Sequence, residues 1–254
     1  MRRHALLIGY SGWDINGQER LNTSLDIENY KSFLMSLNGG AWLHSDIEEE
    51  NEITVIQDKS LEEINDTIEE IQKEQYDVVF TVFSGHGDYD DIENYCRRLE
   101  VSKKDCILET DLLKFADRQI LILDSCSGLR SEEKAVRSNS INDGYTLLQG
   151  TREFYIARKK YEELCLSCIP QTLRFYAAEA GNYANDTSMG GLYSRALLKT
   201  LRFATEELNI FQAHNKAAEI VRKETLNNQK PDYTVPKIHN FLPGTLAIRQ
   251  PIYS

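Results

Sequence analysis

The sequence predicts an α/β domain built on a parallel sheet, because buried-strand patterns alternate with helical patterns along the chain. Three continuous runs of apolar and β-branched residues have the composition of strands covered on both faces: His4 to Tyr10, Tyr76 to Phe83 and Arg118 to Asp124. Helical periodicity separates them, as in proteins whose parallel strands are joined by helical crossovers. The 254 residues suffice for one large domain of this kind, or for two small ones.

Two weaker strand patterns and several helical patterns complete the alternation. The weaker strands are expected at Glu52 to Gln57 and at Leu173 to Ala178. Ser60 followed by Glu63 matches a capping box, so a helix is predicted to begin after Ser60. The other predicted helices are Leu21 to Leu37, Thr110 to Ala116, Leu192 to Phe203 and Leu208 to Leu226.

Two long stretches show neither the helical pattern nor the strand pattern of apolar residues. Asp88 to Asp105 is charged and aperiodic, and Ser131 to Cys168 is first polar and then rich in Arg, Lys and Tyr. Loops of this length inside a compact domain are usually functional or disordered. Both stretches are therefore left without an assigned helix or strand.

Charge and hydropathy restrict the classes of partner. The formal net charge is −11, which favours solubility and argues against a nucleic acid or a membrane surface as partner. No run approaches the roughly 18 apolar residues of a membrane span. The apolar run within Met1 to Gly9 is too short for a secretion signal and fits a first strand better, so a cytoplasmic protein is expected.

The five cysteines do not form a recognisable framework. An odd number in a chain of this length argues against a set of structural disulfides. Cys165 and Cys168 form a single C-x-x-C pair, and a zinc site needs a second pair, which Cys96 and Cys106 do not supply. Structural or incidental cysteines are the simpler interpretation, and no metal site is predicted from them.

The groups that carry chemistry follow two of the predicted strands. One strand ends in the segment Ser84 to Gly87, which contains His86, and another ends in Asp124 to Gly128, which contains Cys126. Ligands of such sheets bind outside the carboxyl ends of the strands. If the two strands are neighbours, His86 and Cys126 face one cleft.

A histidine and a cysteine so placed fit nucleophilic catalysis. A thiolate attacks a peptide carbonyl, and an imidazole helps to generate the thiolate and protonates the leaving amine. The amides of Gly87 and Cys126 are candidates for an oxyanion hole. Each residue alone has a simpler explanation, a surface histidine or a small buried cysteine. The pair in glycine-bearing turns favours catalysis.

The two segments resemble the signature of caspase-like and metacaspase-like cysteine proteases. Val78 to Asp88 reads VVFTVFSGHGD and Ile120 to Gly128 reads ILILDSCSG, in the family's order of histidine before cysteine. His4 to Tyr10 resembles the family's first strand, and Tyr176 to Leu197 resembles its small-subunit strand, substrate loop and helix. Leu21 to Leu34, which includes Asp26, resembles a metacaspase segment loosely, since Asn22 and Ser24 depart from the pattern.

The resemblance implies a fold, a domain organisation and a catalytic dyad. The implied fold is the caspase–hemoglobinase fold, a roughly six-stranded, mostly parallel sheet between helices. It implies one peptidase domain over residues 1–254, with a large-subunit-like part (1–130), a linker (131–168) and a small-subunit-like part (169–254). It also implies a dyad of His86 and Cys126, without an obligatory third member, that acts on a protein or peptide substrate.

The residues around Cys126 bear on specificity. Asp124 and Ser125 stand where animal caspases have Gln and Ala, which resembles metacaspases and other prokaryotic-type members that cut after arginine or lysine. Asp124 and Asp186 occupy positions that match the acidic first pocket, and Glu179 is a further candidate. A carboxylate selects a cation through a charge-assisted hydrogen bond. As alternatives, Asp124 caps local N–H groups and Asp186 is a turn residue.

Two further expectations concern regulation. The acidic run after the histidine suggests calcium activation by analogy with metacaspases, although its spacing lacks the EF-hand pattern and a solvated loop is the alternative. No other cofactor is expected. Basic residues of the linker are candidate self-cleavage sites, with a solvated basic loop as the alternative. The acidic run is Asp88, Asp90, Asp91 and Glu93, and the basic residues are Arg130, Arg137, Arg152, Arg158, Lys159 and Lys160.

Other classes of protein stay open. A catalytically silent scaffold of the same fold usually lacks the dyad, and both members are present here. Separase-like and gingipain-like proteases share the dyad, whereas serine and metal hydrolases are disfavoured because G-x-S-x-G and H-E-x-x-H are absent. By analogy with bacterial and fungal members, the expected role is activation of an effector in cell death or antiviral defence, such as a gasdermin-like pore-forming protein. Monomer and dimer are not distinguished.

Overall fold

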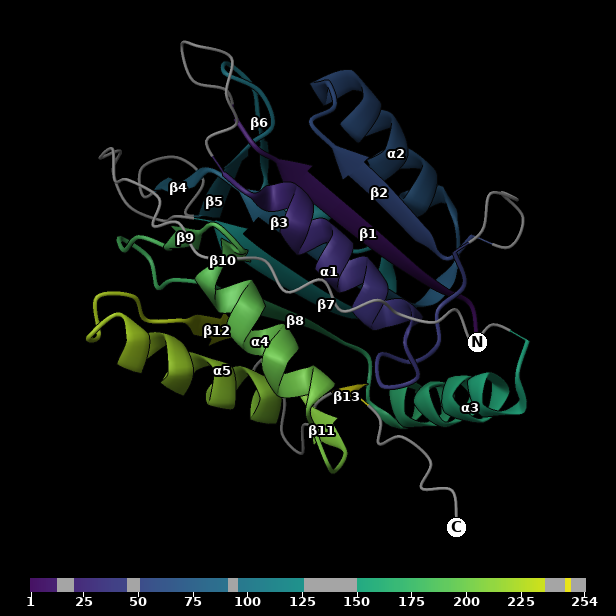
Figure 1. Cartoon of the computed structure of the whole chain (residues 1–254). Helices are drawn as coiled ribbons and strands as arrows, with labels where there is room; N and C mark the ends of the chain where they lie inside the picture. Colours follow the sequence, from purple (N-terminus) through teal and green to yellow (C-terminus); the bar gives the residue numbers. More distant parts are fainter. Residues whose placement is uncertain (13–20, 45–50, 91–95, 126–149, 236–244, 248–254) are drawn as a thin grey trace.

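The computed structural model describes residues 1–12, 21–44, 51–90, 96–125, 150–235 and 245–247, and contains a central six-stranded sheet (Figure 1). The strand order is β12-β8-β7-β3-β1-β2. All neighbours are parallel except β12, which pairs antiparallel with β8. The expectation of a mostly parallel, roughly six-stranded sheet is confirmed. Its strands are β1 (Arg3–Tyr10), β2 (Ile53–Gln57), β3 (Tyr76–Gly85), β7 (Ala116–Ser125), β8 (Gln171–Tyr176) and β12 (Asp232–Thr234).

Helices cover both faces of the sheet, so that it forms the middle of three layers. Successive residues of β1 point to opposite faces of the sheet, so that Leu7 lies in one apolar cluster and Leu6 in the other. The larger cluster joins the sheet to four helices, and the smaller one joins it to α2 and the chain around β5. The helices are α1 (Thr23–Met35), α2 (Leu61–Lys73), α3 (Arg152–Ser167), α4 (Leu192–Arg202) and α5 (Ile210–Glu224).

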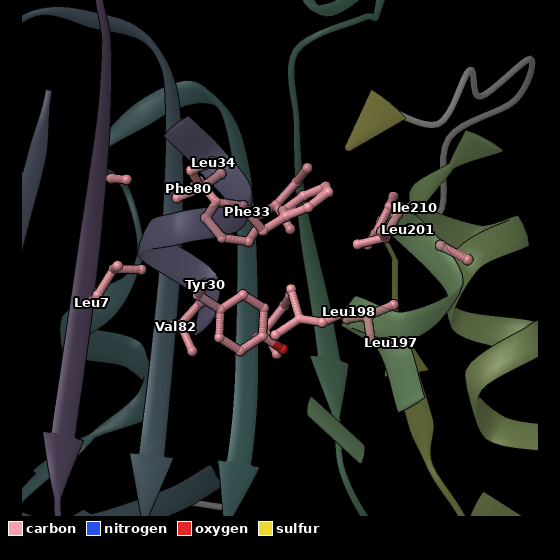
Figure 2. Close-up of a cluster of buried hydrophobic side chains, with 14 of the residues drawn as sticks. Leu7, Tyr30, Phe33, Leu34, Phe80, Val82, Leu197, Leu198, Leu201 and Ile210 are labelled. Atoms are coloured by element: carbon pink, nitrogen blue, oxygen red, sulfur yellow. The ribbon is translucent and has the colours of Figure 1, made fainter. Parts of the chain in front are cut away.

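The larger cluster fixes α1 and α4 on the same face. Tyr30 and Phe33 of α1 pack between Phe80 of β3 and the aliphatic side chains of α4, among them Leu197 (Figure 2). Tyr30, Phe33, Phe80 and Leu197 are at most 1% exposed. Burial of side chains of this size contributes roughly 1.5–3 kcal/mol each, so these contacts position both helices firmly.

The predicted capping box at the start of α2 is present. The Ser60 hydroxyl accepts a hydrogen bond from the Glu63 N–H at 3.3 Å, and the Glu63 carboxylate accepts one from the Ser60 N–H at 3.1 Å. Two backbone donors at the helix start are thereby satisfied.

Two strands lie in the stretch Asp88 to Asp105, which the sequence left unassigned, and a third follows it directly. β4 (Gly87–Asp90), β5 (Cys96–Glu100) and β6 (Cys106–Leu108) form a separate antiparallel sheet. The alternation in β5 was hidden because a buried position carries Arg97, which is 2% exposed and lies 4.0 Å from Glu109. A partner distant in sequence makes that charge tolerable inside the protein.

A helix, α3, occupies the second half of the stretch Ser131 to Cys168. Thr151 caps it by accepting a hydrogen bond from the Phe154 N–H at 3.2 Å. The buried face is Phe154, Ala157, Tyr161 and Cys165. Charged residues between these positions concealed the helical period from the sequence analysis.

The short predicted helix Thr110 to Ala116 is largely wrong. Only the 3₁₀ turn η2 (Glu109–Leu112) forms, and Ala116 already begins β7. The remaining strands are short pairs: β9 (Asp186–Thr187) with β10 (Gly190–Gly191), and β11 (Leu208–Asn209) with β13 (Thr245–Ala247). Of the helices in the described ranges, none has the length and apolar character to cross a membrane.

Candidate active site

The strands that precede His86 and Cys126 are neighbours, as the sequence analysis required. β3 and β7 pair in parallel with Gly85 opposite Ser125, so both strands end at the same edge of the sheet. His86 follows β3 directly and is half-buried. Cys126 follows Ser125 in the chain and lies outside the described residues.

The turn that carries His86 contacts the end of β7. A Cβ atom placed on Gly87 would lie 3.1 Å from Ser125 Oγ and 2.8 Å from the Arg98 carbonyl oxygen. A side chain at position 87 therefore has no room. The His86 carbonyl accepts a hydrogen bond from the Glu100 N–H at 3.0 Å, so β5 anchors the turn. Of the two amides expected in an oxyanion hole, that of Gly87 lies in this turn and that of Cys126 is outside the described residues.

Three carboxylates, which we call the acidic cluster, meet beside these strand ends: Asp26, Asp124 and Asp186. Asp26 of α1 is 2% exposed and accepts hydrogen bonds from the Ser84 hydroxyl at 2.7 Å and the Gly191 N–H at 2.9 Å. Asp124, at the end of β7, is 5% exposed and accepts one from the Ser194 N–H at 2.9 Å. The cluster thus joins the sheet, α1 and α4.

Asp26 and Asp124 cap the N-terminus of α4. The N-cap residue of that helix, Gly191, has no side chain that could satisfy the helix's unpaired N–H groups. The two carboxylates accept hydrogen bonds from Gly191 and Ser194 instead, and their charge complements the positive end of the helix dipole. The alternative interpretation of Asp124 as a cap therefore describes a real contact, made to α4 rather than to a local turn.

Glycine is required where the chain meets these carboxylates. A Cβ atom on Gly190 would lie 2.8 Å from Asp26 Cγ, and one on Gly191 would lie 2.6 Å from Asp124 Cγ. Gly190 also has a φ of +91°. The backbone of the β9–β10 hairpin can approach the acidic cluster this closely only because both side chains are absent.

Burial raises the pKa of every carboxyl in the acidic cluster. The pKa of Asp26 is well above its usual value because of burial and then the charge of Asp124, partly opposed by the hydrogen bonds from Gly191 and Ser84. Burial also raises the pKa of Asp124, while hydrogen bonds from Ser194 lower it. For Asp186, burial raises the pKa to about 6, with Asn22 donors opposing and the charge of Asp124 adding.

Asp186 ties the β9–β10 hairpin to the start of α1. Its carboxylate accepts hydrogen bonds from the backbone N–H of Asn22 at 3.1 Å and from the Asn22 side chain at 3.4 Å. The Asn22 amide also donates to the Thr187 carbonyl at 2.9 Å. Asp186 thus lies in a short strand and holds two segments together, which goes beyond the role of a simple turn residue.

Glu179 lies in a different environment. Its carboxylate pairs with Lys230 at 3.2 Å and accepts a hydrogen bond from Asn182 at 3.1 Å. Asp26, in contrast, was not among the candidate site residues of the sequence analysis. A signal was available, because Asp26 interrupts the apolar face of α1 beside Ile27 and Tyr30, where a carboxylate needs buried partners.

The residues expected to regulate the protein are only partly described. Asp88 lies in β4 with Arg98 at 3.9 Å, and Asp90 ends the same strand. Asp91, Glu93, Arg130 and Arg137 are outside the described residues. Within the described ranges, no three or more His, Cys, Asp or Glu side chains are arranged so that they could hold a metal ion. The other expected self-cleavage residues, Arg152, Arg158, Lys159 and Lys160, lie in α3.

Comparison with known proteins identifies the family. The family model described as the caspase domain matches residues 2–242. The chain therefore belongs to the caspase family of cysteine peptidases. A search of curated proteins finds no match.

Solved structures agree on the fold. Caspase-1 from Spodoptera frugiperda is 17% identical, with a TM-score of 0.60 over 100% of this chain and 92% of that chain. A structural-genomics protein from Geobacter sulfurreducens is 13% identical, with a TM-score of 0.59 over 98% of both chains. Likeness at this level of identity establishes the fold and nothing finer.

Proposed function

We propose that this caspase-family protein is an endopeptidase in which Cys126 is the nucleophile and His86 transfers the protons. The observation that carries the proposal is the pairing of β3 with β7, in which Gly85 lies opposite Ser125. The next residue of each strand is a member of the proposed dyad. A thiol and an imidazole at one edge of the sheet have the chemistry for peptide hydrolysis.

The proposed reaction has two stages. The Cys126 thiolate attacks the peptide carbonyl carbon, and N–H groups of Gly87 and Cys126 stabilise the negative charge on the carbonyl oxygen. The carbon–nitrogen bond then breaks, and protonated His86 gives its proton to the leaving amine. In the second stage His86 accepts a proton from water, whose oxygen attacks the thioester carbon. The new carboxylic acid leaves as the carbon–sulfur bond breaks, and the Cys126 thiolate is regenerated beside protonated His86.

We assign the pocket for the residue before the cleaved bond to Asp124 and Asp186, joined by Asp26. Ionised Asp124 and Asp186 attract an arginine or lysine side chain, and a bound cation in turn favours the ionised form of carboxyls whose pKa burial has raised. An arginine guanidinium can donate two parallel hydrogen bonds to a single carboxylate. Glu179 is assigned a more distant part of the substrate path, because Lys230 offsets its charge.

Labelling with an electrophilic peptide that ends in arginine tests the dyad. The wild-type protein should be modified, and Cys126→Ala and His86→Ala should each abolish the modification. Cys106→Ala is the matched control, because this half-buried cysteine lies in β6 and is not a member of the proposed dyad. Labelling that survives Cys126→Ala contradicts the assigned nucleophile. A folded wild-type protein that never reacts supports the alternative, a catalytically silent scaffold.

A fluorogenic peptide panel tests the specificity. We expect cleavage after arginine and lysine to exceed cleavage after aspartate and leucine. Charge reversal in the pocket by Asp124→Lys should remove the preference if the protein folds, whereas Asp117→Lys, on the solvent-exposed part of β7, should not. A preference for aspartate in the wild-type protein contradicts the assignment.

The biological role follows as a separate proposal. A protease that cuts after basic residues is suited to activate an effector in the cytoplasm by removing an inhibitory segment, and a gasdermin-like pore-forming protein is the concrete candidate. Co-incubation with such a protein should give one defined fragment that Cys126→Ala does not produce. The same assay with and without a calcium chelator tests calcium activation, and unchanged rates contradict it.

A further inference from the structure

A chain of hydrogen bonds leads from the core to the acidic cluster. The Tyr30 hydroxyl donates to Ser194 Oγ at 3.2 Å. The Ser194 N–H donates to Asp124 Oδ2 at 2.9 Å, and the Ser194 side chain lowers the pKa of the same carboxyl. Tyr30 and Ser194 are both 0% exposed, so water does not compete for these contacts.

The surroundings of Asp124 make these neutral donors important. The titratable groups that face it are Asp26 and Tyr30 of α1, Asp186 of β9 and Tyr193 of α4. All four are acids, so none supplies a positive charge. Stabilisation of the ionised carboxylate depends on hydrogen-bond donors, and the described residues give Asp124 its donors through Ser194.

Tyr30 determines which group donates and which accepts in this chain of hydrogen bonds. Its ring lies among the apolar side chains between α1 and the sheet (Figure 2), and burial holds the pKa of its phenol well above the usual value. The phenol therefore keeps its proton and acts as a donor to Ser194 Oγ. With its oxygen serving as acceptor from Tyr30, the Ser194 hydroxyl keeps its own proton available for the neighbouring Asp124 carboxylate.

We propose that Ser194 and Tyr30 are positioning residues that keep the Asp124 carboxylate ionised and oriented for a cationic substrate side chain. This inference rests on the proposed preference for arginine or lysine. Neither residue needs to contact the substrate. They act on substrate binding, and thus on KM, more than on kcat.

The decisive comparison is Ser194→Thr against Ser194→Val, because the two side chains have nearly the same shape and differ in the hydroxyl. KM for an arginine substrate and the inhibition constant of benzamidine are measured from about pH 5 to 8. For Ser194→Val we expect the acid limb of both profiles to move up by about one pH unit, a roughly tenfold weaker binding on that limb. Ser194→Thr should follow the wild-type profile, and Tyr30→Phe should give a smaller shift in the same direction.

Overlapping profiles of the Thr and Val variants overturn the inference, since only the hydroxyl distinguishes them. If the added methyl group prevents both from folding, Ser194→Ala and Tyr30→Phe, which add no atoms, make the same comparison with the wild-type protein. An equal fall in kcat and in kcat/KM with unshifted limbs also overturns it, because that pattern indicates general damage to the fold.

A direct titration separates this inference from the proposed specificity. The Asp124 carboxyl is followed by ¹³C NMR, with Asp124→Asn used to assign its signal. A higher pKa in Ser194→Val than in Ser194→Thr supports the positioning role even if the wild-type protein rejects arginine substrates, a result that would remove only the specificity proposal. Equal pKa values in the two variants contradict the positioning role whatever the substrate.

Discussion

The close approach of Gly190 to Asp26 makes a quantitative test of how the acidic cluster is built. The change is Gly190→Ala. The new methyl group would overlap the Asp26 carboxylate, 2.8 Å from its Cγ, at a residue whose φ is +91°. The carboxylate must move, and it then loses the hydrogen bond that it accepts from the Gly191 N–H at 2.9 Å.

Two terms give the expected loss of stability. Alanine in the left-handed region costs about 1–2 kcal/mol. Loss of a hydrogen bond to a buried charged group costs roughly 1.5–3 kcal/mol. The total of about 2.5–5 kcal/mol is large, but it does not exceed the stability of most domains, which is about 5–15 kcal/mol. Gly190→Ala should therefore fold and be markedly destabilised.

Gly181→Ala provides the matched control. Gly181 has a similar φ of +82°, and nothing lies within 4 Å of an added Cβ atom. Equilibrium unfolding in urea at about pH 7, followed by tryptophan fluorescence, should give the conformational cost alone for this variant. In an Asp26→Ala background, the cost of Gly190→Ala should fall to the same value. If Gly190→Ala and Gly181→Ala differ by less than about 0.5 kcal/mol, the contact with Asp26 does not have the proposed importance.

Three further predictions concern pH, the buried ion pairs and the histidine turn. Since burial raises the pKa of Asp186 to about 6, above its value of about 3.9 in an unfolded chain, its contribution to stability is lost as the pH rises through that window. Asp186→Asn should therefore raise the Tm near pH 7 and change it little near pH 4, and a greater gain at pH 4 contradicts this. Glu52→Gln leaves the buried guanidinium of Arg3 without its partner and should cost about 3–5 kcal/mol in urea unfolding, where a loss below about 1 kcal/mol argues against the pair. Gly87→Ala should lower kcat/KM at least about tenfold with a small change in Tm, since its Cβ atom would push the turn away from Ser125, and wild-type activity speaks against the proposed site.

The main strands were predictable because each is buried on both faces and reads as a continuous apolar run. β1, β3 and β7 appear within a few residues of the predicted ranges. The same reasoning failed for β5, where a buried position carries Arg97. Glu109 and the ring of Tyr176, which lies 4.1 Å from the guanidinium, make that burial possible. Such partners are distant in sequence and cannot be recognised before the fold is known.

The helix α3 was missed for a related reason. Arg158, which looks like a surface residue in sequence, donates to the Glu52 carboxylate at 2.8 Å and to the Ala41 carbonyl at 3.3 Å. Its charge interrupts the apolar period that Phe154 and Tyr161 would otherwise make visible. Local patterns report which side chains are apolar, whereas burial of a charge depends on long-range pairing.

In the candidate site too, local patterns were predictable from the sequence and long-range partners were not. The order of strands and glycine turns was enough to predict that His86 and the residue after Ser125 lie at one edge of the sheet, and the pairing of β3 with β7 agrees. Asp26 was missed because its partners, Ser84 and Gly191, come from elements far from α1 in sequence. The dyad itself stays a prediction until the labelling experiment is done.

The acidic cluster can both cap α4 and bind a substrate cation, because a carboxylate has more acceptor sites than the fold uses. Each ionised carboxylate offers about four lone-pair positions. At Asp124 the described donors all come from Ser194, and at Asp26 they come from Gly191 and Ser84. Capping α4 needs an oxygen atom in the right place, whereas binding a cation needs a negative charge. An amide in place of Asp124 would still supply the oxygen that caps α4 and would lose only the interaction of the charge with the helix dipole, whereas the proposed cationic substrate depends on that charge directly.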